Sequence, residues 1–290
     1  MRIGALCAAV VAALLLVSAS LFGAEWWLFD ICSRRLAHSR PADPRIVLVS
    51  VDEESVRNLG ELYGRPPYPR DVWALVVDEL KRAGAKVIAF DLLFSEENRA
   101  APEGDRAFAA AIEGAPVILA GTPHPMFRAA ATGKIDLARE QATVHTYPLN
   151  GSLALAAADL FETGGTGSQP VPAGLRARRS SGNDEALLVR WNGAKANPED
   201  LSYAHVDLDK VILAALRREE ATLDAATAEA FAKNFRGKIV LVGYTAKGLV
   251  DLRANPLSPV AAGVELHANA IDNLINRDFT APLRAARRFR

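Results

Sequence analysis

The sequence predicts an α/β fold in which a largely parallel central sheet carries helices on both faces, preceded by an N-terminal transmembrane helix. Residues 46–51 and 86–90 are short runs of mostly aliphatic side chains, a pattern typical of strands that are buried on both faces. Residues 71–83 lie between them and have the periodicity of a helix. Strand, helix and strand at this spacing form a βαβ unit, whose crossover makes the two strands parallel.

The N-terminal residues 3–22 form an uncharged, almost wholly apolar run, about as long as a bilayer-spanning helix. We assign residues 1–24 to a transmembrane anchor; the alternative is a signal peptide cleaved at the weak site in residues 17–19. Trp26 and Trp27 follow, where aromatic side chains gather at membrane interfaces. The charged residues that flank this run weakly disfavour export of the residues that follow it. Residues 25–44 are the expected juxtamembrane stalk, helical until two prolines end it.

The helix expected at residues 71–83 has a clear inward face. Trp73, Val76, Val77 and Leu80 stand at i, i+3, i+4 and i+7, which places them on one stripe facing the core. Asp71 is the expected N-cap. A short helix at residues 56–59 and a rigid, proline-rich loop at residues 63–69 come before it.

Later segments predict more elements of the same kind. A helix capped by Asp105 leads to a third apolar run at 117–120, and the middle of the chain offers an edge strand at 143–149, an alanine-rich helix at 153–161, a strand at 186–191 and a helix at 206–217. Residues 239–243 are another buried strand, and residues 263–276 are a helix. The glycines at 164–168 do not join a strand to a helix, so they indicate no phosphate-binding loop.

Composition excludes some functions. The 290 residues carry no net formal charge, which gives no electrostatic basis for nucleic-acid binding. The two cysteines, Cys7 and Cys32, lie in and just after the apolar leader, so neither a disulfide framework nor a cysteine-based metal site is expected. Cys32 is either an unpaired thiol or an intermolecular bridge in a dimer. We expect no cofactor.

Two aspartates, Asp52 and Asp91, each follow a predicted strand. Parallel strands end at one edge of the sheet, where open α/β folds place their ligand crevices. The two carboxylates are therefore either a functional pair or structural groups that cap a backbone amide or bind an arginine. Arg70 is the candidate partner in both cases, because a guanidinium matches a carboxylate with two hydrogen bonds.

His267 lies near the start of the last predicted helix. It is either a packed histidine at a sheet–helix junction or a ligand-binding or proton-sensing group near Asp251. The candidate ligand-binding residues are therefore polar groups that follow strands or open helices: Asp52, Ser55, Arg70, Asp91, Thr245, Asp251 and His267. No residue is assigned a catalytic or metal-binding role.

Five segments, in this order, resemble a known bacterial module. They are IVLVSVDEES at 46–55, YPR at 68–70, AGAKVIAFDLLFSE at 83–96, FRGKIVLVGYTAKGLVD at 235–251 and GVELHANAIDNLI at 263–275. The module is the second subtype of the CHASE domains, the cyclase- and histidine-kinase-associated sensory extracellular domains. Tyr68 stands where this family more often has tryptophan, and Asn255 where it often has threonine.

The resemblance implies a sensor rather than an enzyme. Residues 45–280 would be an extracytoplasmic sensor domain, periplasmic or extracellular, on a bacterial cytoplasmic membrane. Residues 281–290 would be a basic tail leading to a missing membrane and output region. The implied partners are the membrane, an unknown small ligand, a second copy in a homodimer, and a cytoplasmic cyclase or kinase output, either in cis or in trans.

Two other classes of function stay open at this point. One is a hydrolase that uses a metal such as magnesium at the strand-end aspartates, since magnesium prefers carboxylates and water. The other is a structural dimerisation module, whose mark would be an exposed apolar face on the stalk.

Overall fold

The computed structural model describes residues 10–11, 13–14, 17, 24–37, 40–94, 102–120, 146–148, 153–163, 186–192, 201–246, 248–249 and 252–278. Its centre is a five-stranded sheet in the order β3-β2-β7-β1-β6, and every neighbouring pair is parallel. The strands are β1 (Ile46–Val51), β2 (Val87–Leu93), β3 (Val117–Ala120), β6 (Ala204–Asp207) and β7 (Ile239–Tyr244). The predicted parallel α/β fold is confirmed.

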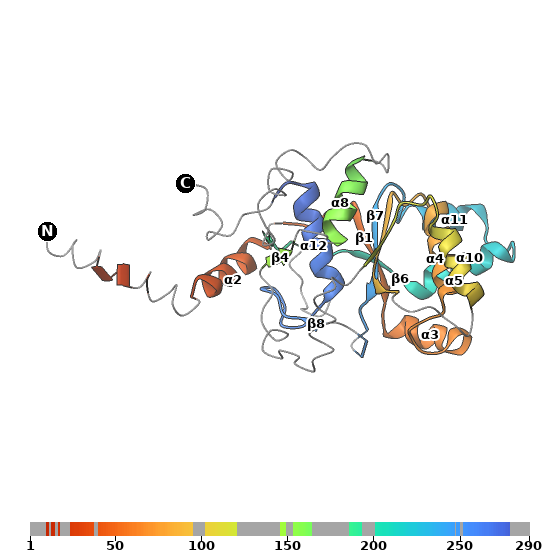
Figure 1. The fold of residues 1–290 in the computed structure, drawn as a ribbon, viewed down its shortest axis with the longest axis horizontal. Helices are drawn as coiled ribbons and strands as arrows, with labels where there is room; N and C mark the ends of the chain where they lie inside the picture. The colour runs from red at the N-terminus through yellow and green to blue at the C-terminus, as the bar shows by residue number, and fades with distance from the viewer. Residues whose placement is uncertain are drawn as a thin grey trace.

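Helices cover both faces of this sheet (Figure 1). One face carries α8 (Leu153–Thr163) and α12 (Gly263–Ile275). The other carries α3 (Glu53–Tyr63), α4 (Arg70–Arg82), α5 (Pro102–Ile112), α10 (Leu208–Glu219) and α11 (Ala225–Ala232). Because the two faces are both covered, alternate residues of the central strands enter two separate cores, which explains why their sequence is continuously apolar.

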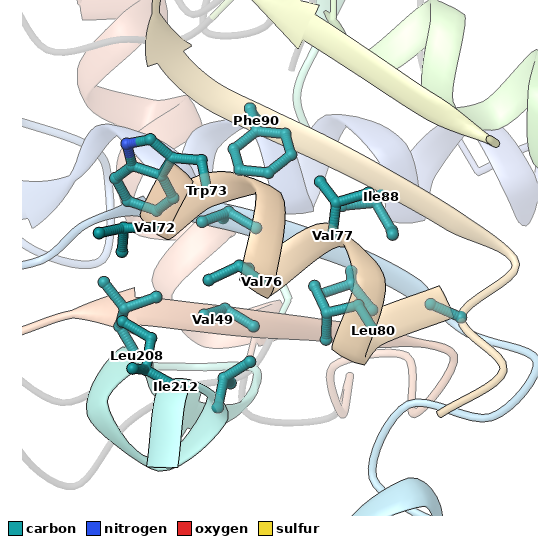
Figure 2. Close-up of a cluster of buried hydrophobic side chains, with 14 of the residues drawn as sticks. Val49, Val72, Trp73, Val76, Val77, Leu80, Ile88, Phe90, Leu208 and Ile212 are labelled. Carbon is teal, nitrogen blue, oxygen red and sulfur yellow. The ribbon is translucent and has the colours of Figure 1, made fainter. Parts of the chain in front are cut away.

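The first core is built around α4 (Figure 2). Trp73, Val76, Val77 and Leu80 are all buried, as predicted. Their partners in Figure 2 come from the strands and from α10. Burying side chains of this size contributes about 1.5–3 kcal/mol each. This core therefore holds the carboxyl end of β1, the start of α4 and the start of α10 in fixed relative positions.

The start of α4 differs from the prediction. The helix begins at Arg70 and its N-cap position is Pro69, with no side-chain cap; Asp71 lies in the first turn. Pro69 has a ψ of 154°, so it is extended rather than helical, and it has no amide hydrogen to leave unpaired; the helix therefore begins at the next residue, Arg70, and not after Asp71.

Four elements, β6, α11, β8 and β9, differ in type from the prediction or were not predicted. Residues 206–207, expected to open a helix, belong with residues 204–205 to the edge strand β6, and α10 begins at Leu208. Helix α11 had no counterpart in the prediction. The expected strands at 143–149 and 186–191 are shorter, β4 (Thr146–Pro148) and β5 (Ala186–Leu188), and they pair with each other outside the central sheet. Strands β8 (Leu252–Arg253) and β9 (Ala261–Ala262) form another small sheet.

The segment expected to form the stalk contains α2 (Ala24–Ala37), which projects from the domain (Figure 1). Phe29 packs against the α12-side core, and Arg34 Nε donates to the Pro256 carbonyl at 2.6 Å. Trp27 and Leu36 are 63% and 53% exposed. None of the helices that the structure describes is long and apolar enough to span a membrane, and most of residues 3–22 lie outside the described part.

A hydrogen-bonded group joins the start of β1 to the end of α12. The Asp43 amide donates to Asp272 Oδ2 at 3.0 Å, and Asn276 Nδ2 donates to both Asp43 Oδ2 and Asp272 Oδ1 at 2.8 Å. The buried Tyr203 hydroxyl also donates to Asp272 Oδ2, at 2.9 Å. The chain segments that enter and leave the domain are therefore held side by side.

Candidate functional site

The strands β2, β7 and β1 are neighbours in the sheet, so their carboxyl ends form one continuous edge. Asp91, expected to follow its strand, lies within β2 near its carboxyl end; Thr245 follows β7, and Asp52 follows β1. The Thr245 amide donates to the Val51 carbonyl at 3.1 Å, which ties the exit of β7 to that of β1. This edge is where the sequence placed the candidate site.

On the α12 side of the edge, Asp91 and His267 meet. His267 Nε2 lies 3.2 Å from Asp91 Oδ1, and both side chains are about three-quarters buried. The close approach of α12 depends on Gly243 in β7, because a Cβ added there would lie 2.9 Å from two atoms of Val264 and 3.5 Å from Asp91 Cβ. The glycine thus lets the first turn of α12 sit against the strand and brings His267 to Asp91.

On the α3 and α10 side, Asp52 has a structural role. It is the N-cap of α3, and its Oδ1 accepts from the Ser55 amide at 2.8 Å. The fully buried Ser55 hydroxyl lies at 3.4 Å from Asp209 Oδ1 and also from the Asp209 amide. These contacts hold the start of α3 against the start of α10, and they occupy part of the Asp52 carboxylate.

Arg70 pairs elsewhere. Its Nε lies 3.7 Å from Asp105 Oδ1 in α5, and its guanidinium lies over the Phe94 ring at 5.0 Å from the centroid. The described ionic partner of Arg70 is therefore Asp105, rather than Asp52 or Asp91 as the sequence had suggested. The guanidinium connects α4 to α5 and to the residue after β2.

Two buried hydroxyls at this edge lack a hydrogen-bond partner among the described residues: those of Tyr68 and Thr245. Tyr68 is only 4% exposed, and burial raises the pKa of its hydroxyl to about 12, with further contributions from Tyr244, Asp209 and Asp52. The hydroxyl is therefore a neutral donor at physiological pH. An unsatisfied buried donor is costly to the fold, so each such group calls for an explanation.

Asp207, at the end of β6, is a further polar residue at this edge of the sheet. Asp207 accepts from the Ser50 hydroxyl at 3.0 Å and from Lys210 Nζ. Burial would raise the pKa of Asp207, but the hydrogen bonds from Lys210 and Ser50 outweigh it and lower that pKa. Asp207 is therefore a carboxylate with its charge already balanced.

The predicted residues thus form two groups on opposite faces of one sheet edge: Asp91 with His267, and Asp52 with Ser55. Asp251 lies outside the described residues. Sequence reasoning missed Tyr68 as a site residue, because a tyrosine in a proline-rich loop carries no spacing signal for burial. Within the part of the chain that the structure describes, no group of three or more His, Cys, Asp or Glu side chains is placed to hold a metal ion.

The fold is thus a parallel α/β sheet covered by helices on both faces, with polar groups at the carboxyl edge, where open α/β folds place their ligand crevices. Comparison with family models makes the class specific: the CHASE2 domain model matches residues 7–289. The chain belongs to the CHASE2 domain family, a family of extracellular sensor domains. Searches of curated proteins and of solved structures each gave no match.

Proposed function

We propose that this protein is the membrane-anchored, extracytoplasmic input domain of a bacterial signal-transduction protein. The observation that carries the proposal is the CHASE2 match over residues 7–289. The apolar run at residues 3–22 would be the anchor in the cytoplasmic membrane, and the domain would be periplasmic or extracellular. Its state would reach a cyclase or kinase output, in cis or in trans.

The signal is a small ligand bound at the carboxyl edge of the sheet. Support comes from the Asp91–His267 contact at 3.2 Å and from the Tyr68 and Thr245 hydroxyls, which have no partner in the described residues. A ligand with hydrogen-bond acceptors would satisfy the hydroxyls, and a polar group on it would meet the Asp91–His267 pair. Asp52 and Ser55 would hold the helix starts that shape the site.

A thermal-shift screen of the full chain in detergent, against metabolites at several pH values, tests this assignment. A ligand of this edge should raise the unfolding temperature of the parent and lose its effect in His267→Gln and Asp91→Asn. Glu113→Gln is the control, because Glu113 is an exposed acid just after α5, near the amino ends of the strands. A ligand that stabilises both site variants as well as the parent binds elsewhere, and this site assignment is then wrong.

The location of the domain needs a separate test. A reporter that is active only outside the cytoplasm, fused after residue 278, should give activity equal to that of an exported standard. Fusion of a reporter that works only in the cytoplasm at the same position should give none. The reverse result would contradict the extracytoplasmic proposal, whatever the ligand screen shows.

A homodimer formed through the stalk is a second proposal, and the exposed side chains of α2 favour it. Leu28, Cys32 and Leu36 stand at i, i+4 and i+8, and all three are exposed. Such a stripe is typical of a helix that packs against another helix. Sedimentation at several concentrations should show that Trp27→Ser with Leu36→Ser weakens association. Equal association of parent and variant would exclude the stalk as the interface.

A further inference from the structure

A hollow of about 440 Å³ lies between the last turns of α4 and α10 and the helix α11, far from the candidate site. It adjoins the turns that precede β2 and β7, so it lies at the amino ends of these strands, whereas Asp91 lies at the carboxyl ends. The three elements form part of the same helical layer (Figure 1). Arg82 at the end of α4, Arg218 in the last turn of α10 and Arg236 in the turn between α11 and β7 line the hollow.

Backbone hydrogen bonds fix two of these arginines relative to each other. The Gly237 amide donates to the Gly84 carbonyl at 2.8 Å, and the Lys86 amide donates to the Lys238 carbonyl at 2.9 Å. Gly84 has φ +82°, a conformation that favours glycine, and this turns the chain sharply after α4. The turn after Arg82 and the turn containing Arg236 are therefore joined by their main chains.

Carboxylates orient the guanidiniums of Arg218 and Arg236. Glu79 is fully buried, and it accepts from Arg218 Nε at 2.8 Å and from Arg218 Nη2 at 2.7 Å. Glu229 accepts from both terminal nitrogens of Arg236 at 2.7 Å. Two-pronged pairs of this kind hold a guanidinium in one plane. Arg82 has a looser contact, with Nη1 at 3.7 Å from Glu79 Oε2, so its guanidinium is not held by a two-pronged pair with a described carboxylate.

The charge in the hollow is not balanced. Among the described groups, three guanidiniums face the two carboxylates of Glu79 and Glu229, which leaves one positive charge. The other described lining residues are alanines and Leu223. Arg82 and Arg218 also stabilise the C-terminal ends of their helices, but that role requires neither Arg236 nor an apolar floor.

We propose that this hollow binds a small organic oxyanion, a carboxylate or a phosphate ester with a short apolar body. Arg82 would supply the donors of its guanidinium, Arg236 would supply its remaining Nε–H, and the body would lie on the alanine face of α11. Carboxylate and phosphate groups can each accept two parallel hydrogen bonds from the planar guanidinium group of an arginine. This inference does not depend on the sensor proposal, because none of these residues belongs to the carboxyl-edge site.

Calorimetric titration of the full chain in detergent tests the proposal, with sodium phosphate and sodium succinate as probes and sodium chloride holding the ionic strength constant. Saturable binding of either probe is expected, and the better probe distinguishes a phosphate from a carboxylate ligand. Arg82→Gln should weaken binding about tenfold or more, because hydrogen bonds to charged groups carry that much. Glu229→Gln should strengthen binding, because it removes a carboxylate that competes for Arg236.

Arg217→Gln is the matched control, since Arg217 is exposed in the same turn of α10 but does not line the hollow. It should bind the probe like the parent. Arg218 is left intact in these tests because its loss would remove the two hydrogen bonds that the buried Glu79 accepts from it. Absence of saturable binding for both probes overturns the proposal, as does equal weakening by Arg217→Gln and Arg82→Gln, which would mark a general charge effect.

Discussion

Two tyrosines allow a direct test of the claim that the carboxyl edge holds an unsatisfied donor. Tyr68 and Tyr203 are both buried, at 4% and 2% exposure, so Tyr→Phe deletes one buried oxygen in each case. The Tyr203 hydroxyl donates to Asp272 at 2.9 Å, whereas that of Tyr68 has no partner in the described part of the chain. Loss of a buried hydrogen bond costs about 1–3 kcal/mol. A buried polar group without one costs a similar amount, about 1–3 kcal/mol.

The two variants should therefore move the free energy of unfolding in opposite directions. Tyr203→Phe should lower it by about 1–3 kcal/mol. Tyr68→Phe should raise it by about 1 kcal/mol, because the fold no longer carries an unsatisfied donor. Urea denaturation of the full chain in one detergent, monitored by tryptophan fluorescence, measures the free energy of unfolding of both variants. The comparison requires equal m-values, because a changed m-value would mean that the unfolded or folded state itself had changed. If Tyr68→Phe destabilises the fold as much as Tyr203→Phe does, its hydroxyl is satisfied, and the argument for a ligand donor there fails.

Three further predictions concern the scaffold. Arg218→Met should lower the free energy of unfolding by about 3 kcal/mol, because it leaves the fully buried Glu79 with only the longer Arg82 contact, and adding Glu79→Met should recover most of that loss in the same denaturation assay. Hydrogen bonds from Arg45 and Asn276 outweigh burial and lower the pKa of Asp43 from 3.8 to about 2. The ionised Asp43 carboxylate therefore contributes fully to stability above about pH 4, and this contribution is lost as the pH falls towards 2. In Asp43→Asn the free energy of unfolding should fall less between about pH 4 and pH 2 than in the parent. An equal fall in parent and variant would contradict this. Gly243→Ala should lower the free energy of unfolding by about 1–3 kcal/mol, because the added methyl group clashes with α12. Gly60→Ala on α3, where nothing lies within 4 Å of the added Cβ, should raise it by about 0.5–1 kcal/mol. Equal effects of the two substitutions would refute the packing argument.

The parallel sheet was predictable because strands that are buried on both faces have few polar residues on either face. Runs such as residues 46–51 and 239–243 lack the alternation of polar and apolar residues and are apolar except for Ser50 and Gly243, and the stripe that includes Trp73 and Leu80 defined α4. Strand β6 carried no such pattern. It is a short edge strand whose residues are exposed or half-buried, and it runs directly into α10, so its pattern merged with that of the helix.

The candidate site was predictable to the level of the sheet edge, but not to its pairs. Strand ends locate Asp52 and Asp91, because chain direction alone decides which edge they reach. The contact of Asp91 with His267 depends on how closely α12 approaches β7, which is set by Gly243 far along the chain. The pairing of Arg70 with Asp105 depends likewise on the packing of α4 against α5. Such contacts arise from tertiary structure and leave no local pattern.

The position of α12 has a mechanical consequence. This helix carries His267 near its first turn and Asp272 near its end, and Asp272 is hydrogen-bonded to the Asp43 amide at the base of the stalk. At about 1.5 Å per residue it is a rod of about 20 Å. A shift of α12 that starts at the His267 end would act on the segment leading to α2 through the hydrogen bond between Asp272 and the Asp43 amide.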